Sequence, residues 1–197
     1  RTFAGEPLPS GLVHFYTGSG PWGTRKGGAH IEKVFDAPAL LTAAQAREQE
    51  ARFAHFRRLA ERGGNLESGK KLFTTACATC HNVGGQGGQI GPVLNGAGAM
   101  GTDTLLRAII TPNAAMEAGY RNYRVEMMNE EILDGFLVAQ DDNVIILRQP
   151  NKSDERVPKN KVRRAEFTKN SLMPEGLLDA MHPEDVRDLF AYLRTLK

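Results

Sequence analysis

The chain has 197 residues, of which 41% are hydrophobic and 24% are charged. This length suits one domain with sizeable additions or two small domains, and the composition excludes collagen-like, disordered and coiled-coil proteins. The 25 basic and 23 acidic residues nearly cancel, so the chain lacks the strong positive charge of a nucleic-acid-binding protein. No apolar stretch approaches the ~18 residues that a membrane span needs. Two cysteines are too few for the disulfide framework of a small secreted protein, so their role is the main question.

Residues 1–64 are expected to form an extended arm followed by a helix, and no function is assigned to them. Glycine and proline are frequent over residues 1–40, which is typical of an irregular segment. We expect this arm to pack against something rather than to be free, and the alternative is a tail held by crystal or domain contacts. The helix should cover residues 41–62, because Thr42 and Gln45 form a capping-box pattern at its start and two glycines follow its end.

Two further helices are predicted around the cysteines. The stretch NLESGKKLFTTACATCH begins with Asn65 as a helix cap and leads directly into the cysteines. A later stretch, TDTLLRAIITPNAAM, predicts a helix that is capped near Thr102 or Asp103 and stopped by Pro112. The residues expected on the buried face of this helix are Leu105, Leu106, Ile109 and Ile110.

The last third of the chain combines strands with one helix. Apolar and polar residues alternate over residues 121–168, with turn-forming clusters between the runs, so we predict a small antiparallel sheet or barrel. The stretch HPEDVRDLFAYLRTLK has Pro183 in its first turn and acidic residues beside it, which predicts an amphipathic helix. Its buried face should consist of Val186, Leu189, Phe190 and Leu193. Together these patterns predict an α+β fold.

The two cysteines stand in the sequence Cys77-Ala78-Thr79-Cys80-His81, which has the C-x-x-C-H spacing that attaches c-type haem. On a helical turn, positions i, i+3 and i+4 share one face, so both thiols and the imidazole can reach one flat ligand. The thiols would form thioethers to the porphyrin, and His81 would bind the iron.

Three alternatives for this motif are weaker. A zinc knuckle needs a fourth ligand at short spacing, and the chain has no further cysteine. A thioredoxin-like redox pair should follow a strand at the start of a helix, whereas these cysteines follow a helical pattern. A structural disulfide would leave the adjacent histidine unexplained.

Several separated blocks resemble a known family. Gly69 and Phe73 in GKKLFTTACATCH, followed by GPVL at residues 91–94, resemble class I cytochromes c. A closer resemblance is to the CxxCH haem-binding domain common in planctomycetes and verrucomicrobia. The blocks that carry it are CATCHNVGGQGGQIGPVLNGAG, LLRAIITPNAAMEAGY, SLMPEGLLDAM and DLFAYL.

This resemblance implies a mostly α class I cytochrome c core with an inserted antiparallel β domain. The core would consist of residues 65–120 and 169–197, and the β insertion of residues 121–168. Residues 1–64, the arm and helix, lie outside the resemblance.

The resemblance implies that Met173 of the SLMPEGLL block is the second axial ligand of the haem iron. The residues themselves also favour it, because a Met-Pro pair in a loop before the last helix presents a thioether stiffly. Methionine opposite histidine raises the reduction potential and suits electron transfer. The alternatives are Met181 as the ligand, a second histidine ligand, or a plain core role for Met173.

Other residues are expected to support the haem. In class I cytochromes the carbonyl of the Gly-Pro proline accepts a hydrogen bond from the ligating histidine, and Pro92 is the matching residue. Gly69 and Phe73 should pack the first cytochrome helix against Phe190 and Tyr192 of the last one. Three residues near the start of the sheet are candidates for hydrogen bonds to haem propionates: Tyr120, Arg121 and Tyr123.

The sequence therefore predicts a monohaem c-type cytochrome with one covalent haem c and with His81 and Met173 on the iron. It would be an electron-transfer protein, or the electron-transfer domain of a larger oxidoreductase, rather than an enzyme. The resemblance implies a periplasmic or otherwise extracytoplasmic location and suggests a carbohydrate dehydrogenase as redox partner. The alternatives are a haem-based sensor or haem enzyme with a displaceable sixth ligand, and an interaction module built on the sheet.

One charged segment could steer a redox partner. Basic residues outnumber acidic ones over residues 148–169, and such a cluster is either an ordinary solvated face or a docking surface for an acidic protein. Its basic members are Arg148, Lys152, Arg156, Lys159, Lys161, Arg163, Arg164 and Lys169.

Overall fold

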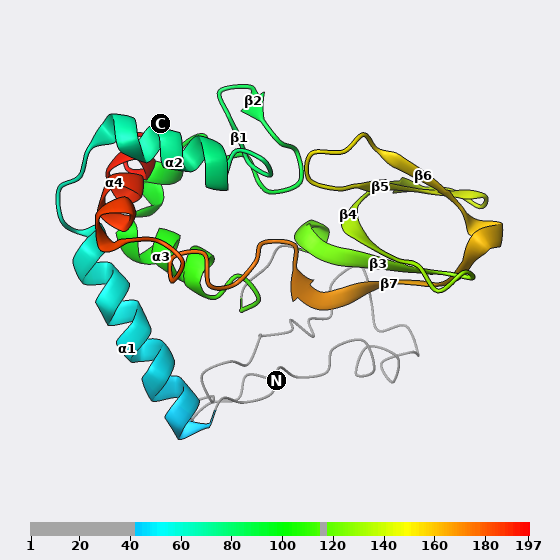
Figure 1. Cartoon of the computed structure of the whole chain (residues 1–197), viewed down its shortest axis with the longest axis horizontal. Coiled ribbons are helices and arrows are strands. Elements are labelled where there is room, and N and C mark those ends of the chain that lie inside the picture. The colour runs from blue at the N-terminus through cyan, green and yellow to red at the C-terminus, as the bar shows by residue number, and fades with distance from the viewer. Residues whose placement is uncertain (1–41, 115–117) are drawn as a thin grey trace, which may run out of the picture. The chain divides into compact units, whose positions relative to one another are not determined.

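The computed structural model describes residues 42–114 and 118–197 (Figure 1). Residues Glu50–Lys197 form one compact unit. The arm expected over residues 1–40 lies outside the described residues, so that expectation stays a prediction.

Helices and strands both contribute to the described part of the chain. The helices are α1 (Ala43–Ala60), α2 (Leu66–Ala76), α3 (Thr102–Ile110) and α4 (Pro183–Leu193), with short 3-10 turns η2 (Ala97–Met100), η3 (Ala118–Tyr120) and η4 (Lys159–Lys161). The strands are β1 (Asn82–Val83), β2 (Gln86–Gly87), β3 (Arg121–Met127), β4 (Ile132–Gln140), β5 (Val144–Arg148), β6 (Glu155–Pro158) and β7 (Val162–Ser171). This mixture confirms the expected α+β class. None of the helices in the described ranges is both long and apolar enough to span a membrane.

Two predicted helix caps are confirmed. In the capping box of α1, the Thr42 backbone N–H donates to Gln45 Oε1 at 2.9 Å, and the Gln45 backbone N–H donates to Thr42 Oγ1 at 3.2 Å. At the start of α2, the Ser68 backbone N–H donates to Asn65 Oδ1 at 3.0 Å. These side chains satisfy backbone groups that have no partner inside a helix, so local sequence alone fixes both helix starts.

The predicted cap of α3 is wrong. The N-cap is Gly101, with φ of 81°, and no side chain caps the helix. Glycine adopts this positive φ without steric cost, so the chain enters the helix without a capping side chain. The Asp103 carboxylate instead pairs with Arg57 Nε at 3.0 Å. The helix ends at Ile110, just before Pro112, as predicted.

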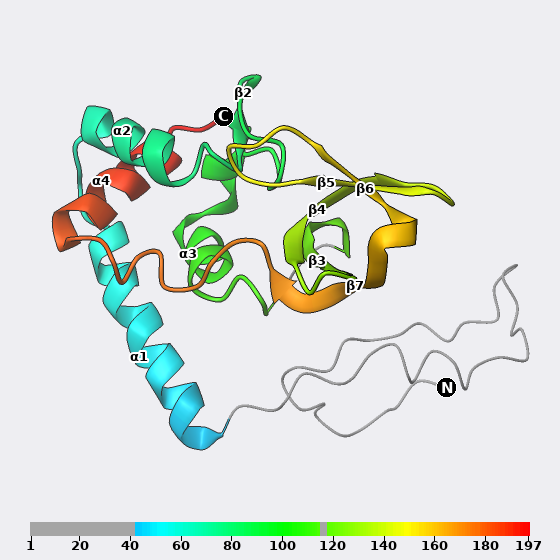
Figure 2. The same ribbon diagram turned by 45° about the vertical axis from the view of Figure 1, so that its right-hand side comes forward.

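The helical core forms where α2 packs on α4 (Figures 1 and 2). The rings of Phe73 and Tyr192 lie 5.4 Å apart, and Phe190 is fully buried in the same cluster. A Cβ added at Gly69 would lie 2.0 Å from the Asp188 carbonyl oxygen, so only glycine allows this close approach. The expected packing between these two helices is therefore confirmed. The predicted buried face of α4 is also confirmed: Val186, Leu189, Phe190 and Leu193.

Gly69→Ala should destabilise the protein. Because the new methyl group would lie 2.0 Å from the Asp188 carbonyl oxygen, the two helices must move apart, and overpacking of this kind costs about 2–3 kcal/mol. The urea midpoint measures this loss in unfolding free energy. Gly63→Ala is the matched control, since nothing lies within 4 Å of a Cβ there. Equal midpoints for the two variants would contradict this account of the helix crossing.

The predicted antiparallel sheet is confirmed. Its five strands have the order β6-β5-β4-β3-β7, and every pairing is antiparallel (Figure 2). A separate two-stranded ladder joins β1 and β2. Alternate residues of the larger sheet face a second apolar core, which consists of Tyr123, Val125, Leu133, Ile145, Leu147 and Val157.

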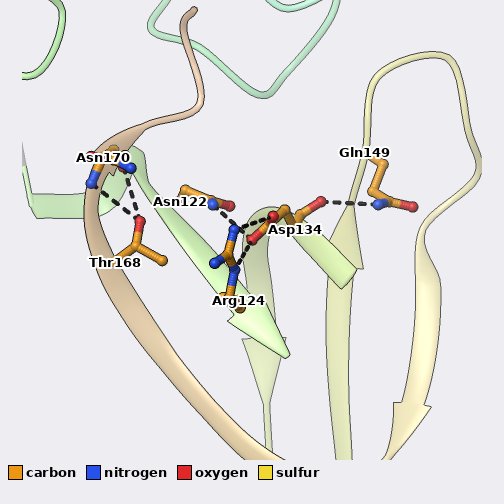
Figure 3. Close-up of polar contacts among 6 residues, drawn as sticks. All are labelled: Asn122, Arg124, Asp134, Gln149, Thr168 and Asn170. Carbon is orange, nitrogen blue, oxygen red and sulfur yellow. Dashed lines mark hydrogen bonds and ion pairs between the residues drawn. The ribbon is translucent and has the colours of Figure 1, made fainter. Parts of the chain in front are cut away.

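A polar cluster stabilises the sheet near the start of β3 (Figure 3). Arg124 binds both carboxylate oxygens of Asp134, at 2.9 and 2.8 Å, and Asn122 Nδ2 donates to the same carboxylate at 2.8 Å. Gln149 Nε2 donates to the Asp134 carbonyl oxygen at 2.9 Å. The hydrogen bond from Arg124 holds the pKa of the Asp134 carboxyl below its usual value. The pair thus stabilises the sheet near neutral pH, and this contribution is lost as the pH falls through the folded-state pKa.

Candidate functional site

The C-x-x-C-H motif forms one helix-like turn directly after α2. The helix ends at Ala76, and Cys77 is its C-cap. The backbone N–H groups of Cys80 and His81 both donate to the Cys77 carbonyl oxygen, at 3.1 and 2.9 Å. The cysteines therefore follow the helix rather than lie within it. The i to i+3 and i to i+4 bonds nevertheless keep the helical spacing that the sequence analysis required for both thiols and the imidazole.

Both cysteines are free, partly buried thiols. Burial raises the pKa of Cys77 to about 11, and the neighbouring Cys80 adds to this shift. Burial also raises the pKa of Cys80. Reactive redox cysteines have lowered pKa values that favour the thiolate, so these thiols do not fit the thioredoxin-like alternative. The described residues contain no cluster of three or more His, Cys, Asp or Glu side chains that could hold a metal ion.

His81 is oriented by one backbone carbonyl. Its Nδ1 lies 2.8 Å from the Pro92 carbonyl oxygen, which is the contact expected from the sequence. A carbonyl oxygen only accepts hydrogen bonds, so Nδ1 carries the proton and, in the neutral ring, Nε2 keeps its lone pair. Nε2 makes no hydrogen bond to any described residue. The imidazole is therefore in the tautomer that binds iron through Nε2.

A glycine-rich loop closes against the C-x-x-C-H turn. The Gly88 backbone N–H donates to the Ala78 carbonyl oxygen at 2.7 Å, and the Gly91 backbone N–H donates to that of Cys80 at 2.8 Å. A Cβ at Gly88 would lie 2.0 Å from the Thr79 carbonyl oxygen. No signal in the sequence identifies Gly88 or Gly91 for this role. The high glycine content predicted a loop, but not that these two glycines lie against the turn.

Gly91→Ala should displace the His81 ring. The added methyl carbon would lie 2.6 Å from His81 Cε1 and 2.8 Å from Nδ1, so the imidazole must turn away from the Pro92 carbonyl. We expect a loss of about 1–3 kcal/mol in unfolding free energy and a lower haem content per chain, measured by thermal unfolding and by haem absorbance. Val93→Ala is the control in the same loop, because Val93 is 60% exposed. Normal haem content in Gly91→Ala would contradict the tight fit.

Met173 lies in the loop between β7 and α4, as the sequence predicts, and its side chain is partly buried. Its backbone N–H donates to Ser171 Oγ at 3.0 Å. The other described methionines have different surroundings. Met181 packs against the helical core, Met127 packs against the sheet core, and Met100 and Met128 are exposed. Met116 lies outside the described residues.

The three propionate candidates have different surroundings. Tyr120 is partly buried and packs against Phe136, with the ring centroids 6.0 Å apart. Arg121 Nε is buried and has no hydrogen-bond partner within residues 42–114 and 118–197. Tyr123 points into the sheet core, and its hydroxyl donates to Gln140 Oε1 at 3.5 Å. The pleat of β3 turns Tyr123 inward, which makes a hydrogen bond from its hydroxyl to a haem propionate unfavourable.

The residues present fit a covalently attached haem. Two free thiols and an imidazole share one turn, the imidazole has the tautomer needed for iron, and glycine leaves the space that the imidazole occupies. Arg121 Nε, which has no hydrogen-bond partner among the described residues, also offers a donor for an anionic group.

A family comparison agrees with this chemistry. Residues 66–145 match the family model of cytochrome c. The match begins at the start of α2, includes the C-x-x-C-H turn and α3, and ends in β5. This part of the chain is thus similar to a class I cytochrome c, a family that binds covalent haem c and serves in electron transfer. The narrower planctomycete and verrucomicrobial resemblance stays a prediction.

Proposed function

We propose that this chain is a monohaem c-type cytochrome that carries electrons, with His81 and Met173 as the axial ligands of the iron. The observation that carries the proposal is the contact of 2.8 Å between His81 Nδ1 and the Pro92 carbonyl oxygen beside two free thiols. This contact leaves Nε2 available to iron. The sequence contains one C-x-x-C-H motif, which implies one haem per chain.

Each residue has a defined role in this proposal. Cys77 and Cys80 attach the haem, and His81 binds iron through Nε2. The Pro92 carbonyl fixes the ring orientation and makes the imidazole more basic, as outer hydrogen bonds to metal-binding histidines do. When bound, the haem supplies a one-electron couple between ferric and ferrous iron, and methionine as the second ligand raises its potential.

The proposed domain organisation is a mostly α cytochrome core, residues 65–120 and 169–197, with the β insertion at residues 121–168. The packing of α2 on α4 supports it, because these helices come from opposite sides of the sheet in the sequence. Two separate apolar clusters, one helical and one in the sheet, also support it.

Visible spectra of the oxidised and reduced protein test the proposed function. We expect one haem per chain, low-spin and six-coordinate in both oxidation states, with a weak far-red sulfur-to-iron band in the oxidised protein. A high-spin ferric component, or rapid binding of carbon monoxide by the reduced protein, would favour the alternative of a sensor or haem enzyme with a displaceable ligand.

The proposed setting is extracytoplasmic, with a redox partner that could be a carbohydrate dehydrogenase. The basic segment 148–169 is the proposed docking surface. Several of its cations are already in ion pairs, among them Arg148 with Asp154, Arg163 with Glu126, and Arg164 with Glu166. Lys161 at the end of η4 is exposed, so it is a direct probe of steering.

Oxidation of the reduced protein by ferricyanide should slow as ionic strength rises. Electrostatic steering of an anion changes association rates by about tenfold or more, and stopped-flow measurements at several salt concentrations give the dependence. The double variant Lys161→Glu with Arg163→Glu should lose most of this dependence of the rate on ionic strength. The control is Lys70→Glu with Lys71→Glu on α2, which changes the charge equally elsewhere. Equal salt dependence in both variants would show that segment 148–169 is an ordinary solvated surface.

A further inference from the structure

The loop that carries Met173 begins at the end of the sheet. Ser171 is the last residue of β7 and pairs with Arg121 of β3. Its hydroxyl accepts a hydrogen bond of 3.0 Å from the Met173 backbone N–H. The chain then passes along α3 and turns into α4 (Figures 1 and 2). The position of Met173 therefore depends on the end of a strand rather than on a free loop.

A single amide side chain holds the loop on both sides of Met173. Asn113, just after α3, accepts a hydrogen bond of 2.6 Å from the Ser171 backbone N–H through Oδ1. Its Nδ2 donates to Glu175 Oε1 at 2.7 Å. The amide orientation is fixed by chemistry, because Oδ1 can only accept and Nδ2 can only donate. Asn113 thus bridges the residues that flank Met173.

The far end of the loop is also held. Asp179 forms a two-point ion pair with Arg52 of α1, including a bond of 3.0 Å from Arg52 Nε to Asp179 Oδ1. The Arg52 guanidinium holds the pKa of this carboxyl below its usual value. The segment from Ser171 to Asp179 is therefore fixed at its start, near Met173 and at its end.

We propose that Asn113 and Ser171 are positioning residues that hold Met173 on the haem iron, and that the sheet anchors the distal ligand through β7. The inference rests on the proposed function, in which Met173 is that ligand. A loop that is ordered before the thioether binds iron loses less conformational entropy on binding. The hydrogen bonds of Asn113 and Ser171 supply this order, so they set how often Met173 leaves the iron.

Carbon monoxide binding to the reduced holoprotein tests the proposal, because Met173 must leave before the gas can bind. Asn113→Ala and Ser171→Ala should each raise the binding rate about tenfold, as expected when hydrogen bonds of ordinary strength are lost. Both variants should also weaken the far-red band of the oxidised protein. Ser171→Thr keeps the hydroxyl and should restore values close to wild type. Asn113→Asp keeps the acceptor for Ser171 but repels Glu175, so it should also speed binding.

Asn129→Ala is the matched control. Its side chain accepts one hydrogen bond of 3.3 Å from the Glu131 backbone in the turn between β3 and β4, away from the loop. Its carbon monoxide rate should equal that of wild type. If Met173→Ala opens the site but the Asn113 and Ser171 variants keep the wild-type rate, the positioning role is wrong and the ligand assignment stands. If Met173→Ala changes nothing, the proposed function itself fails.

Discussion

Met173→Ala should open the sixth coordination position of the haem iron. Because the thioether would be lost, the reduced protein should bind carbon monoxide at least about a hundredfold faster. This rate change corresponds to an activation free energy that is ~2.7 kcal/mol lower. The reduction potential should fall, because methionine opposite histidine raises it. The far-red band should disappear. Flash photolysis, redox titration and absorption spectra measure these three changes on the same preparation.

Met181→Ala separates ligand loss from general damage. Met181 is partly buried and packs against the helical core, so its loss should lower stability by about 1–2 kcal/mol. It should leave the carbon monoxide rate, the potential and the far-red band unchanged. If Met181→Ala instead produces the ligand-loss spectrum, the assignment of Met173 is wrong. Rapid carbon monoxide binding by the wild-type protein would overturn electron transfer as the function.

Local sequence predicts most of the helices and strands, because their signals act over one or two turns. The capping box at Thr42 and the cap at Asn65 form as expected. Alternation in β3 places Tyr123 and Val125 on the same side of the strand, and both are buried. The start of α3 differs, because the Asp103 carboxylate pairs with Arg57 from a distant helix. Tertiary contacts thus override a local cap.

The same contrast applies to the candidate site. The C-x-x-C-H turn is compact in sequence, so its spacing alone predicts that the thiols and imidazole share one turn. The contact between His81 and Pro92 was expected only from the family resemblance. The two residues are eleven positions apart, and sequence spacing alone does not show that they lie close together. Asn113 gave no sequence signal, because its hydrogen-bond partners Ser171 and Glu175 lie far along the chain. Only the folded arrangement of α3, β7 and the loop brings these residues together.

The sheet therefore has a structural consequence that the sequence did not reveal. The pair of strands β3 and β7 ends beside the loop that carries Met173, and the pairing of Arg121 with Ser171 holds the start of that loop in place. The interaction-module alternative treats the sheet as a docking surface for a partner. If Met173 is the axial ligand as proposed, the hydrogen bonds that hold its loop would give the sheet a role in positioning that ligand.

Replacement of both cysteines should convert covalent haem into extractable haem. In the proposed function each thiol would add across one vinyl group of the haem: the sulfur would bond to one vinyl carbon and the thiol hydrogen would go to the other, so no oxidant would be consumed. With Cys77→Ala and Cys80→Ala together, neither thioether can form.

Acidified organic solvent should then remove nearly all haem from the double variant and almost none from wild type, measured by absorbance of the two phases. Each single variant keeps one thioether and should resist extraction. Thr79→Ala changes the same turn without removing a thiol, so it should behave as wild type. His81→Ala should impair haem binding at least as much as the double variant does, because it removes the proximal ligand. A colourless wild-type protein that binds zinc through these residues would refute the haem assignment. The same thiols would then be zinc ligands and could not be attached to haem.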